Sequence, residues 1–334
     1  MSGDAAISVV VPSYEGAARL PATLDALAAS APGVRFEVIV VDDGSRDGTA
    51  AAAGAFRKRL PLRVLRHEAN RGRAAACNTG LRAAGGAVVL LLDDDMRAEP
   101  GMIERHLRAH RDGGPIAALG RIVQQGLSED EPFHLFLRRE EASRRQRLLA
   151  AGTIGFAEVW TGQFSVGREA ALAAGLLDEG IRAYGLEDIE FAYRLAAAGT
   201  RFVYLDDAVS RHHAFADTLE RYCARHASVG TVAAYLARRH DTPEMHRYLR
   251  IVPPRRAGAS LFVRLIDLMS GLLRRPGAAA FFALPPVQAV LRSAILPAER
   301  LRLRRLLALI YSFMRDVQYF RALRRGLARH GEGG

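Results

Sequence analysis

Three adjacent carboxylates follow an apolar run in LLLDDDMRAEP, residues 90 to 100. Asp93, Asp94 and Asp95 repel one another, so the arrangement costs stability unless water solvates the side chains or a cation neutralises them. A solvated acidic turn would explain the triplet, because such turns are common after strands. A site for Mg²⁺ or Mn²⁺ would explain it equally well, because these hard cations take oxygen ligands and bridge them to phosphate oxygens.

Two acidic pairs elsewhere in the sequence could take part in the same chemistry. Asp42 and Asp43 follow the apolar run FEVIVV, where the DDGS sequence is also typical of a tight turn. Glu187 and Asp188 open the amphipathic segment EDIEFAYRLAAAG. A helix dipole stabilises carboxylates at this position, where they serve either as general bases or simply as caps.

The first half of the chain must place these residues, and it alternates between two kinds of segment. Apolar, β-branched runs are separated by Ala-rich segments of helical composition, which predicts a parallel sheet wound by right-handed crossovers. The predicted strands are 7–11, 36–41, 62–66 and 87–92, and the predicted helices are 17–30, 47–59 and 73–84. Ligands bind outside the carboxyl ends of such strands, so the residues after each run should form one site.

Two familiar phosphate-binding motifs are missing from that edge. The sequence contains no GxxxxGK[ST], and NRGRAAACN does not match GxGxxG. A divalent cation held by the carboxylates is the remaining economical way to bind phosphate there.

Six ordered motifs together resemble the family 2 glycosyltransferases, over about residues 6 to 215. They are VVVPSYEG, VIVVDDGSRDGT, NRGRAAACNTG, LLLDDD, GQFSVGREAALAAGLLDE and YGLEDIEFAYRLAAAGTRFVY. The resemblance implies an α/β GT-A fold, with a Rossmann-like, mostly parallel sheet, for residues 1–215, followed by a helical, Arg-rich region over 216–334. It also implies an inverting sugar transfer from a nucleotide-diphosphate sugar. The QxxRW motif of processive members is absent, so a single addition is expected.

The resemblance assigns the donor's base and ribose to the loop formed by Pro12, Ser13, Tyr14 and Glu15. It assigns a hydrogen bond from the base to Asp42, with Asp43 as the alternative acceptor.

A second donor loop is assigned to Asn70, Arg71 and Gly72, which would close over the base and approach the diphosphate. Asn70 could equally cap the helix that starts near Arg73, and Arg71 could be a surface residue. Gly162 would let the backbone approach the donor closely. Trp160, the only tryptophan, is expected either to stack on a sugar or to pack in the core.

Within the acidic triplet, the resemblance assigns Asp95 to the metal and Asp93 to the ribose or a metal-bound water. Asp94, grouped with the donor-binding residues, should point to the opposite side of an extended segment and be structural. His212 matches a position where relatives supply a further metal ligand. The adjacent His213 could match that position instead of His212.

Asp188 is implied as the catalytic base, and Glu187 as a supporting or acceptor-binding residue. The predicted activity is transfer of a sugar from a UDP-, GDP- or dTDP-sugar to an acceptor hydroxyl in cell-envelope polysaccharide or glycolipid synthesis, with Mn²⁺ or Mg²⁺ as cofactor. Two alternatives stay open: a nucleotidyltransferase that makes a nucleotide sugar, and a non-catalytic protein that binds nucleotide sugars at a membrane surface.

The positive charge of the chain lies entirely in its last quarter. Residues 1–249 hold 31 Lys and Arg against 32 Asp and Glu, a net charge of −1, whereas residues 250–334 hold 16 against 4, a net charge of +12. Because this region is also apolar, it favours an anionic membrane surface over nucleic acid as partner. From residue 299 to 329, apolar residues recur at helical spacing, which would equally suit packing on the catalytic domain or a homo-oligomer.

The remaining features indicate a cytoplasmic protein and leave contact with the inner face of the membrane open. Two cysteines make no disulfide framework, and neither a secretory leader nor an uninterrupted apolar run of about 18 residues is found. The lipid-linked character of the acceptor is left open. The charge-rich segment 128–152 is expected to be helical and to serve as an acceptor-side lid or a dimer contact.

Overall fold

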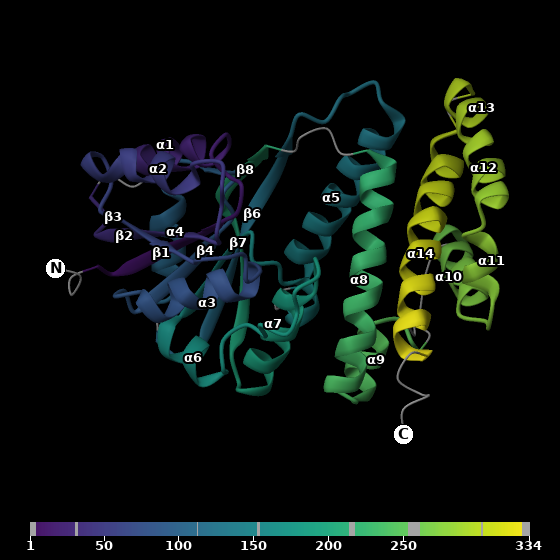
Figure 1. The fold of residues 1–334 in the computed structure, drawn as a ribbon. Coiled ribbons are helices and arrows are strands. Elements are labelled where there is room, and N and C mark those ends of the chain that lie inside the picture. The colour runs from purple at the N-terminus through teal and green to yellow at the C-terminus, as the bar shows by residue number, and fades with distance from the viewer. Residues whose placement is uncertain are drawn as a thin grey trace. The chain divides into compact units, whose positions relative to one another are not determined.

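The computed structural model describes residues 5–30, 33–111, 113–151, 154–213, 218–252, 261–301 and 303–328 (Figure 1). Its contacts divide the chain into two compact units, which are treated separately below. The first comprises Met1–Gly126, Ser143–Arg182 and Glu187–Phe215, and the second comprises Leu127–Ala142, Ala183–Leu186 and Ala216–Gly334. The predicted boundary between residues 215 and 216 lies outside the described residues.

The first unit is built on an eight-stranded sheet with the order β3-β2-β1-β4-β7-β6-β8-β5. The four predicted strands are present and form its parallel half: β1 (Ile7–Ser13), β2 (Phe36–Asp42), β3 (Leu62–Arg66) and β4 (Val88–Leu92). Their side chains are largely buried on both faces, as expected for strands covered by helices.

The other half of the sheet mixes strand directions. It comprises β5 (Met96–Ala98), β6 (Ile116–Gln125), β7 (Gln163–Gly167) and β8 (Arg201–His213). β7 runs antiparallel to both β4 and β6, and β5 runs antiparallel to β8, whereas β6 and β8 are parallel. The sheet is therefore a mixed α/β sheet, with four of its seven neighbouring pairs parallel.

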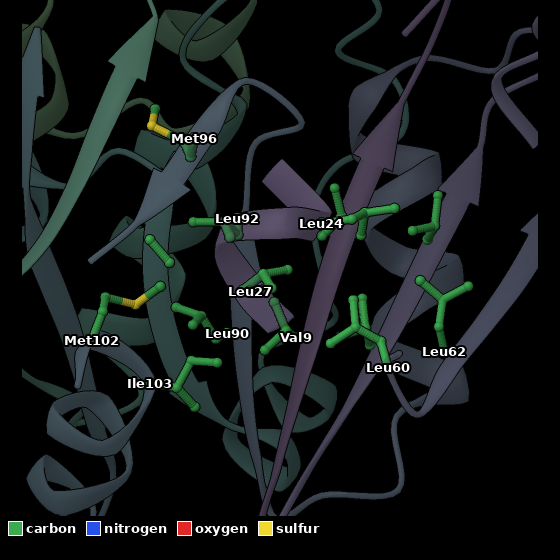
Figure 2. Packing of buried hydrophobic residues seen from close by; sticks show 14 of the residues in the cluster. Val9, Leu24, Leu27, Leu60, Leu62, Leu90, Leu92, Met96, Met102 and Ile103 are labelled. Atoms are coloured by element: carbon green, nitrogen blue, oxygen red, sulfur yellow. The ribbon is translucent and has the colours of Figure 1, made fainter. Parts of the chain in front are cut away.

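Helices cover both faces of the parallel half (Figure 1). On one face, α1 (Leu20–Ser30), α2 (Thr49–Gly54) and α4 (Met102–Ala109) pack on a core that includes Val9, Leu24, Leu27 and Leu90 (Figure 2). On the other face, α3 (Arg73–Ala83) places Gly80 against Val10, and a Cβ at Gly80 would lie 2.2 Å from the valine Cγ1. The first unit also contains α6 (Arg168–Ala173), α7 (Glu187–Ala197) and two short 3₁₀ helices, Ala55–Lys58 and Phe156–Glu158.

The regular elements in the described part of the second unit are all helices. Side chains from three of its helices form an aromatic cluster, in which the Phe133 ring lies 5.5 Å from that of Tyr222 and 5.3 Å from that of Tyr311. The helix α5 begins in this unit and ends in the first. The bounds are α5 (Pro132–Ala150), α8 (Leu219–Arg239), α9 (Pro243–Tyr248), α10 (Leu261–Leu273), α11 (Ala278–Phe282), α12 (Pro285–Ser293), α13 (Ile295–Arg300) and α14 (Arg304–Ala328).

None of the helices in the described ranges combines enough length with enough hydrophobicity to cross a membrane.

A buried ion-pair network holds the second unit together around Asp316, which is 2% exposed. Its Oδ1 accepts hydrogen bonds from Arg250 and from Arg315 Nε, at 2.9 Å each, and its Oδ2 accepts from Ser270 at 2.8 Å. Burial by itself would raise the pKa of Asp316, but the charges of Arg315 and Arg250 outweigh it and hold the pKa well below its usual range.

We expect Asp316→Asn to destabilise this unit by about 3 kcal/mol at pH 7, because two guanidinium groups lose their counter-ion. The carboxylate stabilises the fold above its unfolded-state pKa of about 4, and this contribution fades as the pH falls further. The difference in thermal midpoint, followed by far-UV circular dichroism, should therefore be large at pH 7 and smaller near pH 3. Asp241→Asn, at a position 84% exposed in the same unit, is the matched control and should change neither midpoint.

Candidate active site

The parallel strands bring the predicted loops to one edge of the sheet. In the register of the sheet, Ser13 at the end of β1 pairs with Asp42 at the end of β2, which in turn pairs with Arg66 at the end of β3. Asp93 follows β4 directly, and its backbone N–H donates to the carbonyl oxygen of Gly162 at 3.1 Å.

Asp94 ties the first loop to the acidic triplet. Arg19 donates from Nε to Asp94 Oδ1 at 2.7 Å, and from its terminal nitrogens to the carbonyl oxygens of Tyr14 and Glu15, at 2.7 Å each. Ser13 donates its hydroxyl to Asp94 Oδ2. Asp94 is buried, as an anchor for the loop would be, whereas Tyr14 is 46% exposed.

The backbone of this loop is strained at Glu15, whose φ of 48° lies in the left-handed region. The strain is held by two hydrogen bonds, from Glu15 N–H to Ser45 Oγ and from Arg46 N–H to Glu15 Oε1, at 2.9 Å each. Strained backbone of this kind clusters at functional sites, where the surrounding structure enforces it. Pro12 is the second-to-last residue of β1, directly before Ser13.

Asp42 and Asp43 are both buried but differ in the contacts that they make. Asp43 accepts the backbone N–H of Arg71 at 2.9 Å and that of Gly72 at 2.8 Å, and its Oδ1 lies 2.7 Å from His67 Nδ1. Asp42 accepts the Ser45 N–H through Oδ1. Its buried Oδ2 lies 3.3 Å from Arg66 Nε, in an ion pair, and has no hydrogen-bond partner among the described residues. Asp43 therefore positions the second loop, and Asp42 keeps an acceptor oxygen available.

The second loop does not end in an asparagine cap. The N-cap of α3 is Gly72, with a φ of 95° and no side-chain capping bond. The alternative in which Asn70 caps this helix is wrong, because the turn needs a residue that tolerates a positive φ directly before Arg73. Asn70 is exposed, and Arg71 extends to Glu179 with a separation of 3.0 Å.

Arg73, the first residue of α3, connects three parts of the edge that are far apart in sequence. Its guanidinium forms an ion pair with Asp93, donates to Thr161 Oγ1 at 2.7 Å and lies 3.6 Å from Glu187 Oε1. Sequence reasoning missed this role and used Arg73 only to mark a helix start. The available signal was an arginine at the first turn of a helix that begins beside the predicted site.

Gly162 leaves space for Asp93. A Cβ at this position would lie 3.1 Å from Asp93 Oδ2 and 3.1 Å from the Met96 methyl group, closer than most real Cβ contacts. The close approach of the backbone to the donor that was predicted for Gly162 stays a prediction.

Asp95 and His212 lie side by side because Met96 on β5 pairs with His212 on β8. His212 Nε2 is 3.1 Å from Asp95 Oδ2, and His212 Nδ1 is 2.7 Å from Gln124 Oε1. Both ring nitrogens thus face an oxygen that accepts hydrogen bonds, and a ring with its proton on Nδ1 would present the Nε2 lone pair to a cation held beside Asp95. The His213 side chain lies outside the described residues.

These two residues are a partial fit to a divalent cation. Asp95 Oδ1 is buried without a hydrogen-bond partner, and the oxygen and imidazole donors are ones that Mn²⁺ accepts. Asp93, the third residue predicted near the metal, instead forms an ion pair with Arg73. Within the described ranges, no group of three or more His, Cys, Asp or Glu side chains is placed to hold a metal ion. The protein thus offers two donors, and a bound diphosphate would have to supply further oxygens.

Asp188 lies in the first turn of α7, where its Oδ1 accepts its neighbour Ile189's N–H at 2.8 Å. Burial, together with the negative charge of Glu187, raises the pKa of Asp188 to about 7, although Arg73 acts in the opposite direction. Glu187 Oε2 is buried without a hydrogen-bond partner among the described residues. A carboxyl that titrates near neutral pH is suited to accept and release a proton.

Trp160 packs against the core cluster, and the guanidinium carbon of Arg144 lies 3.4 Å from the centre of its ring. One face of the indole is therefore covered by Arg144, and that face cannot stack on a sugar. The core alternative accounts for these contacts. Trp160 Nε1 is buried without a hydrogen-bond partner, so the indole keeps one donor available.

Comparison of sequences gives a match to the profile described as Glycosyl transferase family 2 over residues 8–171. The uncharacterized glycosyltransferase YfnE of Bacillus subtilis is 30% identical over 250 residues, which cover 61% of this chain and 64% of that protein. The dolichol-phosphate mannosyltransferase of Pyrococcus furiosus is 30% identical over 128 residues, which cover 38% of this chain and 36% of that protein. The matches thus span less than two thirds of each of these relatives.

Solved structures share the fold over almost the whole chain. The mannosyltransferase PcManGT from Pyrobaculum calidifontis, in complex with GDP-Man and Mn²⁺, aligns with a TM-score of 0.58 and 20% identity over 92% of this chain and 85% of that one. Residues 1–349 of TarS from S. aureus align with a TM-score of 0.52 and 17% identity, over 97% and 91% of the two chains. With the motifs described above, the sequence match shows that residues 8–171 belong to glycosyl transferase family 2, and the sheet and the solved structures show that the chain has a GT-A fold.

Proposed function

We propose that the protein transfers one sugar, with inversion, from a nucleotide-diphosphate sugar to an acceptor hydroxyl. The observation that carries this proposal is a set of buried carboxylate oxygens along one edge of the sheet, on Asp42, Asp95 and Glu187, that have no hydrogen-bond partner among the described residues. The Asp42 oxygen has only the ion pair with Arg66. Unpartnered buried acceptors are costly, so a native fold keeps them where a ligand will satisfy them. A donor and an acceptor substrate would supply such partners.

In this proposal the chain's own residues hold the donor in three places. Asp42 accepts a hydrogen bond from the base, the loop of Pro12 to Glu15 borders the base and ribose, and the loop of Asn70 to Gly72 approaches the diphosphate. The contacts from Asp43 and Arg19 fix these loops before the donor arrives, which lowers the entropy cost of binding.

For the reaction, Asp188 takes the proton from the acceptor hydroxyl while that oxygen attacks the anomeric carbon. The bond from this carbon to the diphosphate oxygen breaks at the same time, and the nucleoside diphosphate leaves. A single displacement inverts the configuration of the anomeric carbon. Glu187 and Arg73 hold Asp188 and Asp93 on the same side of the sheet edge.

Asp95 and His212 are the residues that would hold a divalent cation, Mn²⁺ or Mg²⁺, with Asp93 close by. When bound, such an ion would neutralise negative charge on the diphosphate. PcManGT, whose structure contains Mn²⁺ and GDP-Man, has the same fold. We extend the proposal to acceptors at the inner face of a membrane because the C-terminal region is basic and apolar.

Calorimetric titration with UDP, GDP and dTDP, alone and as their sugars, tests the donor site. We expect one nucleotide to bind in the presence of Mn²⁺, with affinity reduced at least tenfold by EDTA and by Asp95→Ala, because one buried carboxylate ligand is lost. Asp207→Ala, at a position 69% exposed on β8, is the matched control and should bind as the wild type does. If none of the three nucleotides binds, the donor site is not where we propose it.

A further inference from the structure

The C-terminal unit contains a cavity of about 670 Å³ that plays no part in the proposed transfer. It is lined by residues from α11, α14, the end of α10 and the turn after α9. Its charged lining residues in the described ranges are all arginines: Arg250, Arg274, Arg321, Arg324 and Arg325. Such a lining is suited to an anion, because guanidinium groups match phosphate oxygens in geometry as well as in charge.

Two of these arginines have hydrogen-bond donors that the protein leaves unused. Arg274 NH1 and Arg321 Nε are buried and have no hydrogen-bond partner among the described residues. Burial, together with the positive charge of Arg250, lowers the pKa of Arg274. The Arg274 guanidinium is therefore repelled by a like charge and also has an unused hydrogen-bond donor. An anionic ligand with several acceptor oxygens would accept the unused hydrogen bonds and would also offset the repulsion between the guanidinium groups.

Two carboxylates, Asp267 and Asp316, act on Arg274, and burial together with the charge of Arg250 outweighs them, so the pKa of Arg274 is still lowered. Asp316 is already bound by Arg250 and Arg315 and accepts a further bond from Ser270. Arg274, Arg321, Arg324 and Arg325 therefore retain an excess of positive charge at the cavity.

The cavity is also apolar, with Phe320, Leu323 and Leu327 in its lining. The C-terminal unit also carries large apolar side chains that face solvent on α10, α11, α12, α13 and the residue after α13, and five of them are between 53% and 71% exposed: Leu268, Phe281, Val290, Leu296 and Leu301. An inorganic anion needs no apolar surroundings, whereas the phosphate of a lipid, with acyl chains beside it, does.

We propose that this cavity binds the headgroup phosphate of an anionic phospholipid and holds the C-terminal unit at a bilayer surface. The arginines contact the phosphate oxygens, and the apolar side chains around them meet the acyl region. The proposal concerns the C-terminal unit alone, so it stands or falls independently of the proposed sugar transfer.

Binding of the full chain to vesicles tests the proposal, with vesicles of phosphatidylcholine compared with vesicles that also contain about 30% phosphatidylglycerol. The variant is Arg274→Gln with Arg321→Gln, which removes the two guanidiniums that have unused donors. The control is Arg304→Gln with Arg305→Gln, which removes the same charge from exposed positions of α14. Thermal midpoints by circular dichroism establish that both variants are folded.

We expect tight binding only to the vesicles that contain phosphatidylglycerol, and we expect the cavity variant to bind them at least tenfold more weakly than the control variant. Equal weakening of the two variants would mean a diffuse electrostatic attraction and would overturn the proposal. A parallel titration with inorganic phosphate and glycerol phosphate separates the two sources of phosphate. If these saturate the cavity at micromolar concentration while vesicles do not bind, the site serves a free phosphate and not a lipid.

Discussion

Asp188→Asn should reduce kcat about 10³-fold, because a general base contributes two to four orders of magnitude to proton transfer. Asparagine keeps the shape and the hydrogen bond to Ile189 N–H but cannot accept the proton from the acceptor hydroxyl. The donor affinity should stay within about threefold of wild type, since the base acts on the acceptor. Release of nucleoside diphosphate under saturating donor measures kcat, and calorimetry measures the donor affinity.

The pH dependence sharpens this test. Only the ionised carboxylate accepts a proton, so kcat/KM of the wild type should rise with pH through about 7, the pKa of Asp188. Because the fold raises this pKa above the unfolded value, ionised Asp188 lowers stability at pH 8 and the neutral form does not. Asp188→Asn should therefore unfold at a higher temperature than wild type at pH 8, with little difference at pH 4. Asp207→Asn is the control and should keep the kcat of the wild type. If Asp188→Asn also kept it, Asp188 would not be the catalytic base.

Arg73→Gln should have the second largest effect, lowering kcat/KM about 10²-fold at pH 7, since small misplacements of reacting groups cost this much. The guanidinium joins Asp93, Thr161 and Glu187, so its loss leaves two carboxylates without their counter-ion. The charge of Arg73 also lowers the pKa of Asp188. The rise of kcat/KM with pH should therefore move to higher pH in the variant, and measurement of the full pH profile will detect it.

A purely structural role for Arg73 would lower kcat/KM without moving the pH profile. Arg73→Lys separates the two cases, because lysine keeps the charge but not the forked geometry of the guanidinium. We expect Arg73→Lys to restore the position of the pH profile and only part of the rate. A profile that stays at the wild-type position in Arg73→Gln would contradict the proposed coupling to Asp188.

The parallel half of the sheet could be predicted from the sequence because its signal is local. The runs of β1, β2 and β4 consist mainly of β-branched and aliphatic residues and end at Pro or Asp, β3 is the short run LRVLR, and each intervening segment is rich in Ala. The antiparallel placement of β7 between β4 and β6 has no such signal, since strand direction depends on pairing partners that lie far away in sequence.

The candidate site shows the same limit at the level of single residues. The sequence indicated that Asp42 and Asp43 lie at the sheet edge. Only the structure shows that Asp43 accepts the backbone N–H groups of Arg71 and Gly72, whereas Asp42 Oδ2 has no hydrogen-bond partner among the described residues. Arg73 was missed for the same reason, because its three partners come from distant segments. The roles of the donor, metal and base residues stay predictions.

The order of strands in the sheet also bears on how the chain is made. β4 pairs with β7, and β5 pairs with β8, whose residue His212 lies more than a hundred positions beyond Met96. The partner of β4 begins at Gln163, 71 positions beyond Leu92, so at ribosomal rates VVLLL of β4 stays an uncovered edge open to aggregation for on the order of ten seconds. Charges that flank such a segment act as gatekeepers against pairing with other chains. The three carboxylates after β4 thus oppose aggregation of the nascent chain before they acquire their partners in the folded protein.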